Sequence, residues 1–171
     1  NDFRELKTYK MKLKQLTLLN LLVFGLMSFT SIPPTTKYKC MIQLSNYTGE
    51  GAYIVISLIN PKGDYEKTLY VQGDDSEWYN TVEDWWKNYY GKKRNNIDAI
   101  TGATISGGER TISVIDIEDS KINTGYKIRF ETAVEDQAYH SKDVEFELTT
   151  ESVKSKKEGT GYIRYVRMIP N

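Results

Sequence analysis

The segment most able to do chemistry is a long loop in which Thr101-Gly102-Ala103-Thr104 places two hydroxyl groups around two residues with almost no side chain. Such a stretch lets a large molecule approach the backbone and the Thr104 hydroxyl closely. Asp98 precedes Thr104 in the same loop, where its carboxylate can cap the turn or orient that hydroxyl. The alternative is an ordinary glycine-containing turn stabilised by Asp98 and Thr101.

An aromatic segment at 77–90 comes directly before this loop and predicts a helix. Its large side chains recur on one helical face, and they are Trp78, Val82, Trp85, Trp86 and Tyr89. The helix either buries its tryptophans against the rest of the fold or turns one ring, Trp85 or Trp86, toward a flat aromatic ligand.

The remaining chain alternates short β-branched segments with turn sequences. Strands are expected at 39–45, 53–60, 67–73, 111–118, 126–134, 144–149 and 161–168. Because no helices alternate with them, they predict a mainly β fold, an immunoglobulin-like antiparallel β-sandwich with one short aromatic helix before the motif loop.

The N-terminal part is expected to lie outside this fold. Lys12 and Lys14 precede an apolar run that is interrupted by polar residues, which is typical of a signal peptide or an N-terminal anchor at 11–32. We interpret 1–10 as an upstream or non-native extension and 38–171 as a single β-sandwich domain. The protein is therefore expected to be exported, to the periplasm or another extracytoplasmic space, and to be membrane-anchored if the N-terminal segment stays uncleaved.

Composition excludes several classes of function. The chain has 23 Lys and Arg against 23 Asp and Glu, scattered along the sequence, which argues against a nucleic-acid partner. Removing 1–31 takes away five basic and two acidic residues, which leaves 18 basic and 21 acidic residues and a net charge of −3. A single cysteine, Cys40, and a single histidine, His140, predict neither a disulfide nor a metal site. A hydrolytic site would have to combine His140 with Asp136 or Asp143, and we expect no catalytic residues of this kind.

The loop resembles a known modification motif. Asp98, Thr101, Gly102, Ala103 and Thr104 match Asp-x-x-(Ser/Thr)-Gly-Ala-Thr, the acceptor motif of proteins to which an exported FMN transferase attaches FMN covalently. The resemblance implies a phosphodiester between the Thr104 hydroxyl and FMN.

Residues 40–150 also resemble a family of predicted periplasmic proteins of unknown function that are found beside PepSY-type membrane reductases and are thought to be flavinylated. The features that carry this resemblance are the Asn60-Pro61 turn followed by Thr68-Leu69, the Trp85-Trp86 pair, the motif loop, and the stretch 116–131 with Gly125-Tyr126.

Together these resemblances imply an extracytoplasmic flavoprotein that transfers electrons between a membrane reductase, of PepSY type or another redox partner, and an acceptor. It would be an electron carrier or redox subunit rather than a stand-alone enzyme, since the flavin supplies the redox chemistry. Four cations near the loop are expected to offset the added negative charge, and they are Lys92, Lys93, Arg94 and Arg110. The alternative is a non-catalytic immunoglobulin-like binding module of the cell envelope.

Overall fold

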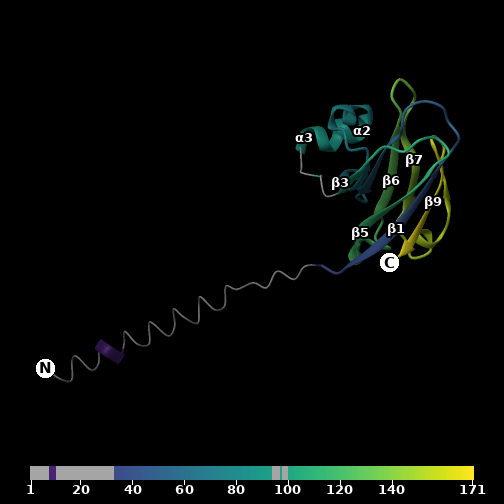
Figure 1. Ribbon diagram of the computed structural model, residues 1–171. Helices are drawn as coiled ribbons and strands as arrows, with labels where there is room; N and C mark the ends of the chain where they lie inside the picture. The colour runs from purple at the N-terminus through teal and green to yellow at the C-terminus, as the bar shows by residue number, and fades with distance from the viewer. Residues whose placement is uncertain (1–7, 11–32, 94–96, 98–99) are drawn as a thin grey trace. The chain divides into compact units, whose positions relative to one another are not determined.

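Two β-sheets face each other in the unit that runs from Pro33 to Asn171 (Figure 1). The structure is a computed structural model and describes residues 8–10, 33–93, 97 and 100–171. The predicted signal or anchor segment at 11–32 lies outside the described residues, as does most of the predicted extension at 1–10. Within the part of the chain that is described, no helix is both long and apolar enough to cross a membrane.

The first sheet has the strand order β5-β1-β9-β8 and is antiparallel. Its strands are β1 (Thr35–Leu44), β5 (Arg110–Glu118), β8 (Lys157–Glu158) and β9 (Ile163–Pro170). Every second residue of the later part of β1 points into the core, because successive side chains of a strand alternate between its two faces; these inward residues are Tyr38, Cys40, Ile42 and Leu44.

The second sheet has the order β4-β3-β2-β6-β7. Its strands are β2 (Tyr53–Ile59), β3 (Tyr65–Gln72), β4 (Thr101–Gly102), β6 (Lys127–Ala133) and β7 (Tyr139–Glu147). Neighbouring strands are antiparallel except β3 and β4, which run parallel. All seven residues of β2 are buried, since the core covers one face of this strand and the aromatic segment covers the other.

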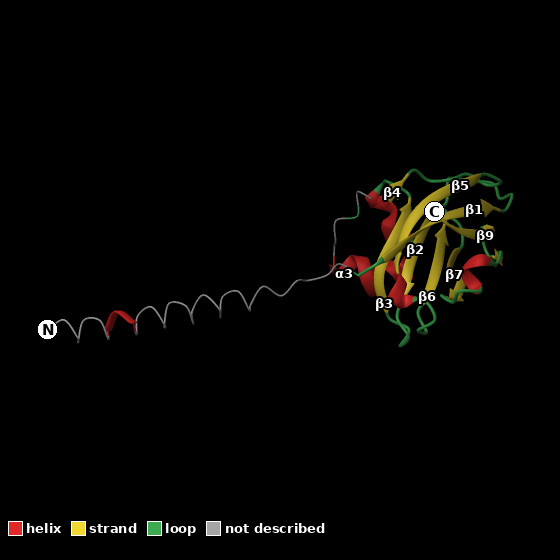
Figure 2. Cartoon of the chain, turned by 90° about the horizontal axis from the view of Figure 1, so that it is seen from below, coloured by secondary structure: helices red, strands yellow, loops and turns green. Residues whose placement is uncertain are grey.

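The aromatic segment is helical but broken into pieces, so the prediction of one regular helix at 77–90 needs correction. It comprises a 3-10 helix η1 (Ser76–Thr81), α2 (Glu83–Trp85), a π-helical turn η2 (Trp86–Tyr90) and α3 (Gly91–Lys93). The break falls at Val82, whose ψ of 77° is outside the helical range, directly after β-branched Thr81. Figures 1 and 2 show this segment beside β3, on the outer side of the second sheet.

The predicted fold class is confirmed: the domain is mainly β, sandwich-like, and carries one short helical segment before the motif loop. All seven predicted strands are present, and β7 begins at Tyr139, before its predicted start. The pattern missed the two-residue strands β4 and β8, and β4 makes the second sheet mixed rather than purely antiparallel. Two further 3-10 turns, η4 (Asp119–Lys121) and η5 (Ser152–Lys154), lie in the connections.

Candidate functional site at Thr104

Thr104 is presented between two points where the backbone is fixed. On one side β4 pairs with the end of β3, with Val71 opposite Thr101 and Gln72 opposite Gly102. On the other side Ile105 forms an isolated bridge with Ala52, in which the Ala52 N–H donates to the Ile105 carbonyl at 2.7 Å. Ala103 and Thr104 lie between these anchors and are exposed. The hydroxyl is thus displayed at the surface on a segment that the sheet holds in place.

The packing around the loop explains why Gly102 of the motif and Gly51, in the chain just before β2, carry no side chain. A Cβ added to Gly102 would lie 2.5 Å from the Tyr70 hydroxyl. A Cβ added to Gly51 would lie 2.6 Å from the Thr104 Cβ, so the Thr104 side chain rests directly on the bare Gly51 backbone. The Gln72 side-chain amide donates to the Ala103 carbonyl and fixes the peptide before Thr104. No group among the described residues forms a hydrogen bond with the Thr104 hydroxyl.

Thr104 opens onto a pocket of about 250 Å³ with an acidic and aromatic lining. Trp78, which is 37% exposed, and the mostly buried Tyr53 supply the aromatic part of the lining. Four carboxylates complete the lining with Gly51, and they are Glu50, Asp74, Asp75 and Glu135. Burial raises the pKa of Tyr53, and the nearby Asp75, Asp74 and Glu135 raise it further, which reports the negative potential of this pocket.

The structure places the two predicted cofactor-binding tryptophans, Trp85 and Trp86, apart from this pocket. Asp98 lies outside the described residues. Trp85 is completely buried, its indole N–H donates to the Thr68 hydroxyl at 2.8 Å, and its ring stacks on Tyr90 at 4.6 Å between centroids. Trp86 is half-buried and also packs near Tyr90. Neither Trp85 nor Trp86 lines the pocket; the tryptophan that does is Trp78.

The cations expected to offset the added charge are directed elsewhere. Arg110 donates to the Gln43 side-chain oxygen at 3.0 Å and to the Tyr165 hydroxyl at 3.3 Å. The Lys93 ammonium lies over the Tyr89 ring, and Lys92 lines a different pocket, while Arg94 is outside the described residues. The described lining of the Thr104 pocket therefore carries carboxylates and no cation.

Comparison with known proteins identifies the family. Residues 35–165 match the family model described as "Predicted periplasmic protein (DUF2271)". The chain belongs to this family. Its matched span includes the motif loop and every described residue of the Thr104 pocket. Neither the curated proteins nor the solved structures contain a match to the chain.

Membership of the DUF2271 family supports the expected export, since its members are predicted periplasmic proteins. The single cysteine of this family member is consistent with a structural role. Cys40 is fully buried, and burial raises the pKa of its thiol to about 12, so the reactive thiolate is strongly disfavoured.

The histidine of this DUF2271 protein lies at a corner where Asp143 holds several strands together. The Asp143 carboxylate accepts four hydrogen bonds, from the backbone N–H groups of 160, 161 and 163 and from the Thr132 hydroxyl. The His140 ring meets the Tyr162 ring edge to face at 4.9 Å. These bonds tie β6 and β7 to the first residue of β9 and to the chain just before it. They also occupy the acceptor capacity of the Asp143 carboxylate, so none is left for His140.

The sequence analysis did not predict the buried carboxylate of Glu131. Glu131, on β6, is fully buried and accepts hydrogen bonds from the Tyr65 and Tyr139 hydroxyls and from the Trp85 backbone N–H. Burial raises the pKa of Glu131 to about 7, and the hydrogen bonds only partly oppose this rise. Glu131 thereby joins β3, β6 and β7 to the last residue of α2. The signal in the sequence was that Glu131 is the one acid of the predicted strand at 126–134.

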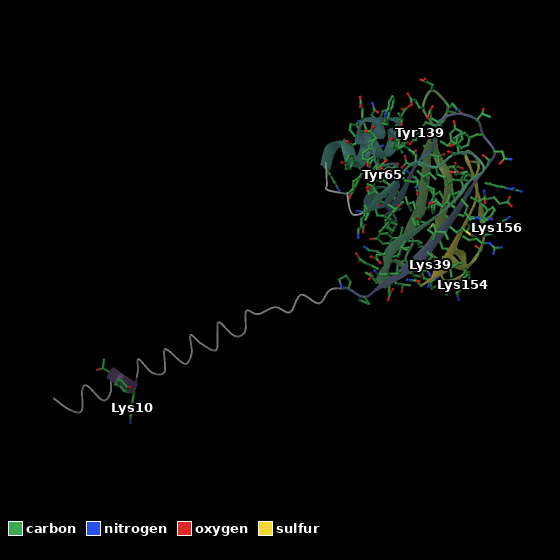
Figure 3. All side chains as sticks on the ribbon, viewed as in Figure 1. Lys10, Lys39, Tyr65, Tyr139, Lys154 and Lys156 are labelled. Carbon is green, nitrogen blue, oxygen red and sulfur yellow. The ribbon has the colours of Figure 1, made fainter. Side chains whose placement is uncertain are left out.

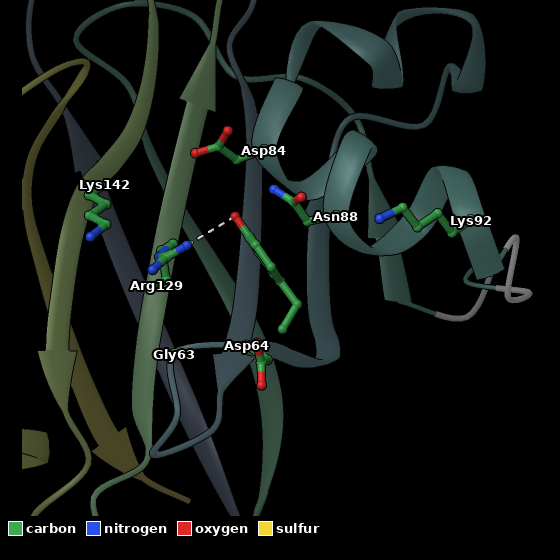
Figure 4. A pocket seen from close by; sticks show the side chains of 8 residues that line it. Gly63, Asp64, Asp84, Asn88, Lys92, Arg129 and Lys142 are labelled. Carbon is green, nitrogen blue, oxygen red and sulfur yellow. Dashed lines mark hydrogen bonds between the residues drawn. The ribbon is translucent and has the colours of Figure 1, made fainter.

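A second pocket of about 490 Å³ lies beside this buried group (Figure 4). Arg129 lines it and donates from Nη1 to the Tyr65 hydroxyl at 3.0 Å and from Nε to Glu145 at 2.5 Å. Lys92, Asp84 and Asn88 face it from the helical segment. This pocket is polar and nearly balanced in charge, and it is separate from the residues that surround Thr104.

Proposed function

We propose that this protein is an extracytoplasmic flavoprotein that carries FMN covalently on Thr104 and passes electrons between a membrane reductase and an acceptor. The observation that carries the proposal is the exposed Thr104 hydroxyl, which no described residue engages and which two backbone anchors present at the surface. It stands at the last position of the acceptor motif. A modifying enzyme needs a substrate hydroxyl that is accessible and held in a defined place.

The surroundings of Thr104 fit a flavin that is partly enclosed. A pocket of about 250 Å³ is smaller than the roughly 300–1,000 Å³ of most small-molecule sites, so it encloses only part of such a cofactor. Trp78 offers an exposed ring face of the kind on which flat aromatic groups stack. An open site suits a carrier, because a redox partner must come close to the group that is reduced or oxidised.

The chain's own residues have three tasks in this proposal. Gly51 leaves the room that the Thr104 side chain occupies, and Gln72 holds the peptide before it. Trp78 covers one side of the pocket. The four carboxylates disfavour extra negative charge there, which favours the oxidised state of a bound redox group. When attached, FMN supplies the one-electron and two-electron chemistry itself.

Co-expression with an exported FMN transferase tests the proposal. The wild-type protein is expected to gain the mass of one FMN less one water and a yellow colour that survives denaturation. Thr104→Ala is expected to lose both. Ser106→Ala is the matched control, because it removes another exposed hydroxyl of the same loop, and it is expected to remain fully modified.

An unmodified, colourless protein in the presence of a transferase that modifies another acceptor would reject the flavoprotein. The alternative would then be a non-catalytic binding module of the cell envelope, with the motif loop as a structural turn. Retained modification in Thr104→Ala would instead show that the attachment point is wrong.

A further inference from the structure

The outer face of the first sheet carries an unusual group of exposed aliphatic side chains. Ile112, Val114 and Ile169 are 61%, 47% and 53% exposed. They are neighbours across the strands: Lys39 of β1 pairs with Val114 on one side and with Ile169 on the other, and Ile112 is opposite Met41. Scattered apolar residues are normal on a surface, but adjacent ones on the solvent side of a sheet mark a contact surface.

Cations are interleaved with these aliphatic groups. The residues of this surface, which we call the basic face, comprise the apolar Met41, Ile112, Val114 and Ile169 and the cationic Lys37, Lys39, Arg110, Lys156 and Arg167. Acids on the same side are Asp116, Glu118 and Glu158. In Figure 3 the labelled Lys39 and Lys156 lie toward β1 and β9, whereas Tyr65 and Tyr139 lie toward the helical segment.

Charge is therefore separated within the domain. The basic face has five cations and three acids, a net charge of +2, whereas residues 32–171 together have −3, so the remainder carries −5. Lys37, Lys39 and Arg167 form no ion pair with any described residue. Their ammonium and guanidinium groups are available for an external anionic surface.

We propose that the basic face docks on an anionic lipid surface. Aliphatic side chains that protrude between cations match the boundary between headgroups and acyl chains, where the cations pair with lipid phosphates and the aliphatic groups enter the outermost hydrocarbon. A face covered by a second copy in a symmetric dimer would instead oppose two positive surfaces, which is unfavourable. The negatively charged remainder, including the carboxylates around Thr104, is repelled by the same lipids, so this face alone approaches them.

Chemical footprinting of lysines tests this docking on the full chain. Any contribution of the N-terminal segment to vesicle binding is then the same in every sample. The protein is mixed with vesicles of phosphatidylcholine alone or of phosphatidylcholine with phosphatidylglycerol, and the acetylation rate of each lysine is measured by mass spectrometry. Lys37 and Lys39 are expected to react about fivefold more slowly with the anionic vesicles only. Lys62 and Lys67, which are exposed on the β2–β3 side, are expected to react equally in both.

Two variants are designed to prevent the docking and leave the Thr104 site unchanged. The acetylation rate of Lys37 is the readout for both. Arg167→Gln, and separately the triple change Ile112→Thr, Val114→Thr and Ile169→Thr, are expected to abolish the protection of Lys37. Threonine keeps the strand preference of the replaced residues. The control Lys62→Gln with Lys67→Gln removes cations elsewhere and is expected to leave the protection intact.

Equal acetylation of Lys37 and Lys39 in both kinds of vesicle would overturn the docking. Protection that is present without vesicles and grows with protein concentration would also overturn it, because a second copy would then cover the face. Neither outcome bears on flavin attachment, which is read from the mass of Thr104-containing peptides.

Discussion

The side chain of Thr104 lies on the backbone of Gly51, so close that a Cβ at position 51 would stand 2.6 Å from the Thr104 Cβ. This contact packs the motif loop against the chain just before β2. In Gly51→Ala the new methyl must push Thr104 away, and a shift of this kind slows reactions that depend on alignment. We expect attachment of FMN to slow tenfold or more in a timed modification assay with the purified transferase.

Gly63→Ala is the control for that variant. Gly63 lies at a bend and has a φ of +93°, which strains any other residue, but a Cβ there meets nothing within 4 Å. Its modification rate is expected to match that of the wild type even if its stability falls. If both variants are modified at the wild-type rate, the Gly51 contact does not position Thr104.

Trp78 is expected to be the aromatic neighbour of the attached flavin. An indole ring in contact with a flavin quenches its fluorescence, so Trp78→Leu is predicted to raise the flavin fluorescence of the modified protein severalfold. Trp86→Leu is the matched variant in the same helical segment, and Trp86 does not line the pocket. Unchanged fluorescence in Trp78→Leu, or an increase in Trp86→Leu instead, would place the flavin ring elsewhere.

The carboxylates of the Thr104 pocket are expected to lower the reduction potential of the modified protein. Reduction adds negative charge, which Asp74 and Asp75 oppose. The double change Asp74→Asn and Asp75→Asn is predicted to raise the midpoint potential by a few tens of millivolts in a spectroelectrochemical titration. Asparagine preserves the cap that the Asp75 side chain forms on the Glu77 N–H at 2.9 Å.

Asp64→Asn, at an exposed turn away from that pocket, is the control and should leave the potential unchanged. A lower potential in the double variant would contradict the account, because it would mean that these carboxylates do not act on the redox group through their charge.

Glu131 predicts a pH dependence of stability. Its pKa is about 7 in the folded protein against an ordinary 4.5, so between these values the folded state keeps a proton that the unfolded chain has lost. The contribution of Glu131 to the free energy of unfolding is therefore fully present below pH 4.5 and decreases as pH rises toward 7. Urea unfolding at several pH values measures this effect. The free energy of unfolding of Glu131→Gln, relative to that of the wild type, should increase over this pH range by up to about 1.4 kcal/mol per pH unit.

Asp116→Asn, at an exposed position of β5, is the reference for the Glu131 measurement. Its stability difference from the wild type should stay nearly constant over the same pH range. A constant difference for Glu131→Gln as well would mean that Glu131 is already ionised in the folded protein at pH 5.

The local alternation of inward and outward residues was sufficient to predict the β-sandwich. Alternating inward residues such as Ile42 and Leu44 define β1 from the sequence, because the period of two is a property of the strand itself. The two-residue strand β4 has no such period. Thr101 and Gly102 become a strand only because the end of β3 lies beside them, and a contact at this distance along the chain leaves no local signal.

The motif of the candidate site can be read from the sequence, but the residues that surround Thr104 cannot. The prediction from the spacing of large side chains over 77–90 assumed one continuous helix. In such a helix Trp78 and Trp85 lie on the same face. The break at Val82 separates them: Trp85 turns into the core with its indole bonded to Thr68, and Trp78 stays at the surface by the pocket. The residues that line the pocket beside Thr104 come from three connections, from β2 and from η1, and only the tertiary fold brings Gly51 and Trp78 to the same place.

The most direct test of the central claim is peptide mapping of the protein after co-expression with the FMN transferase. The account predicts one flavin-fluorescent peptide, whose fragmentation places the added FMN on Thr104, and no such peptide from Thr104→Ala. A chain with an unmodified Thr104, recovered beside a second acceptor that the same transferase has modified, would contradict it.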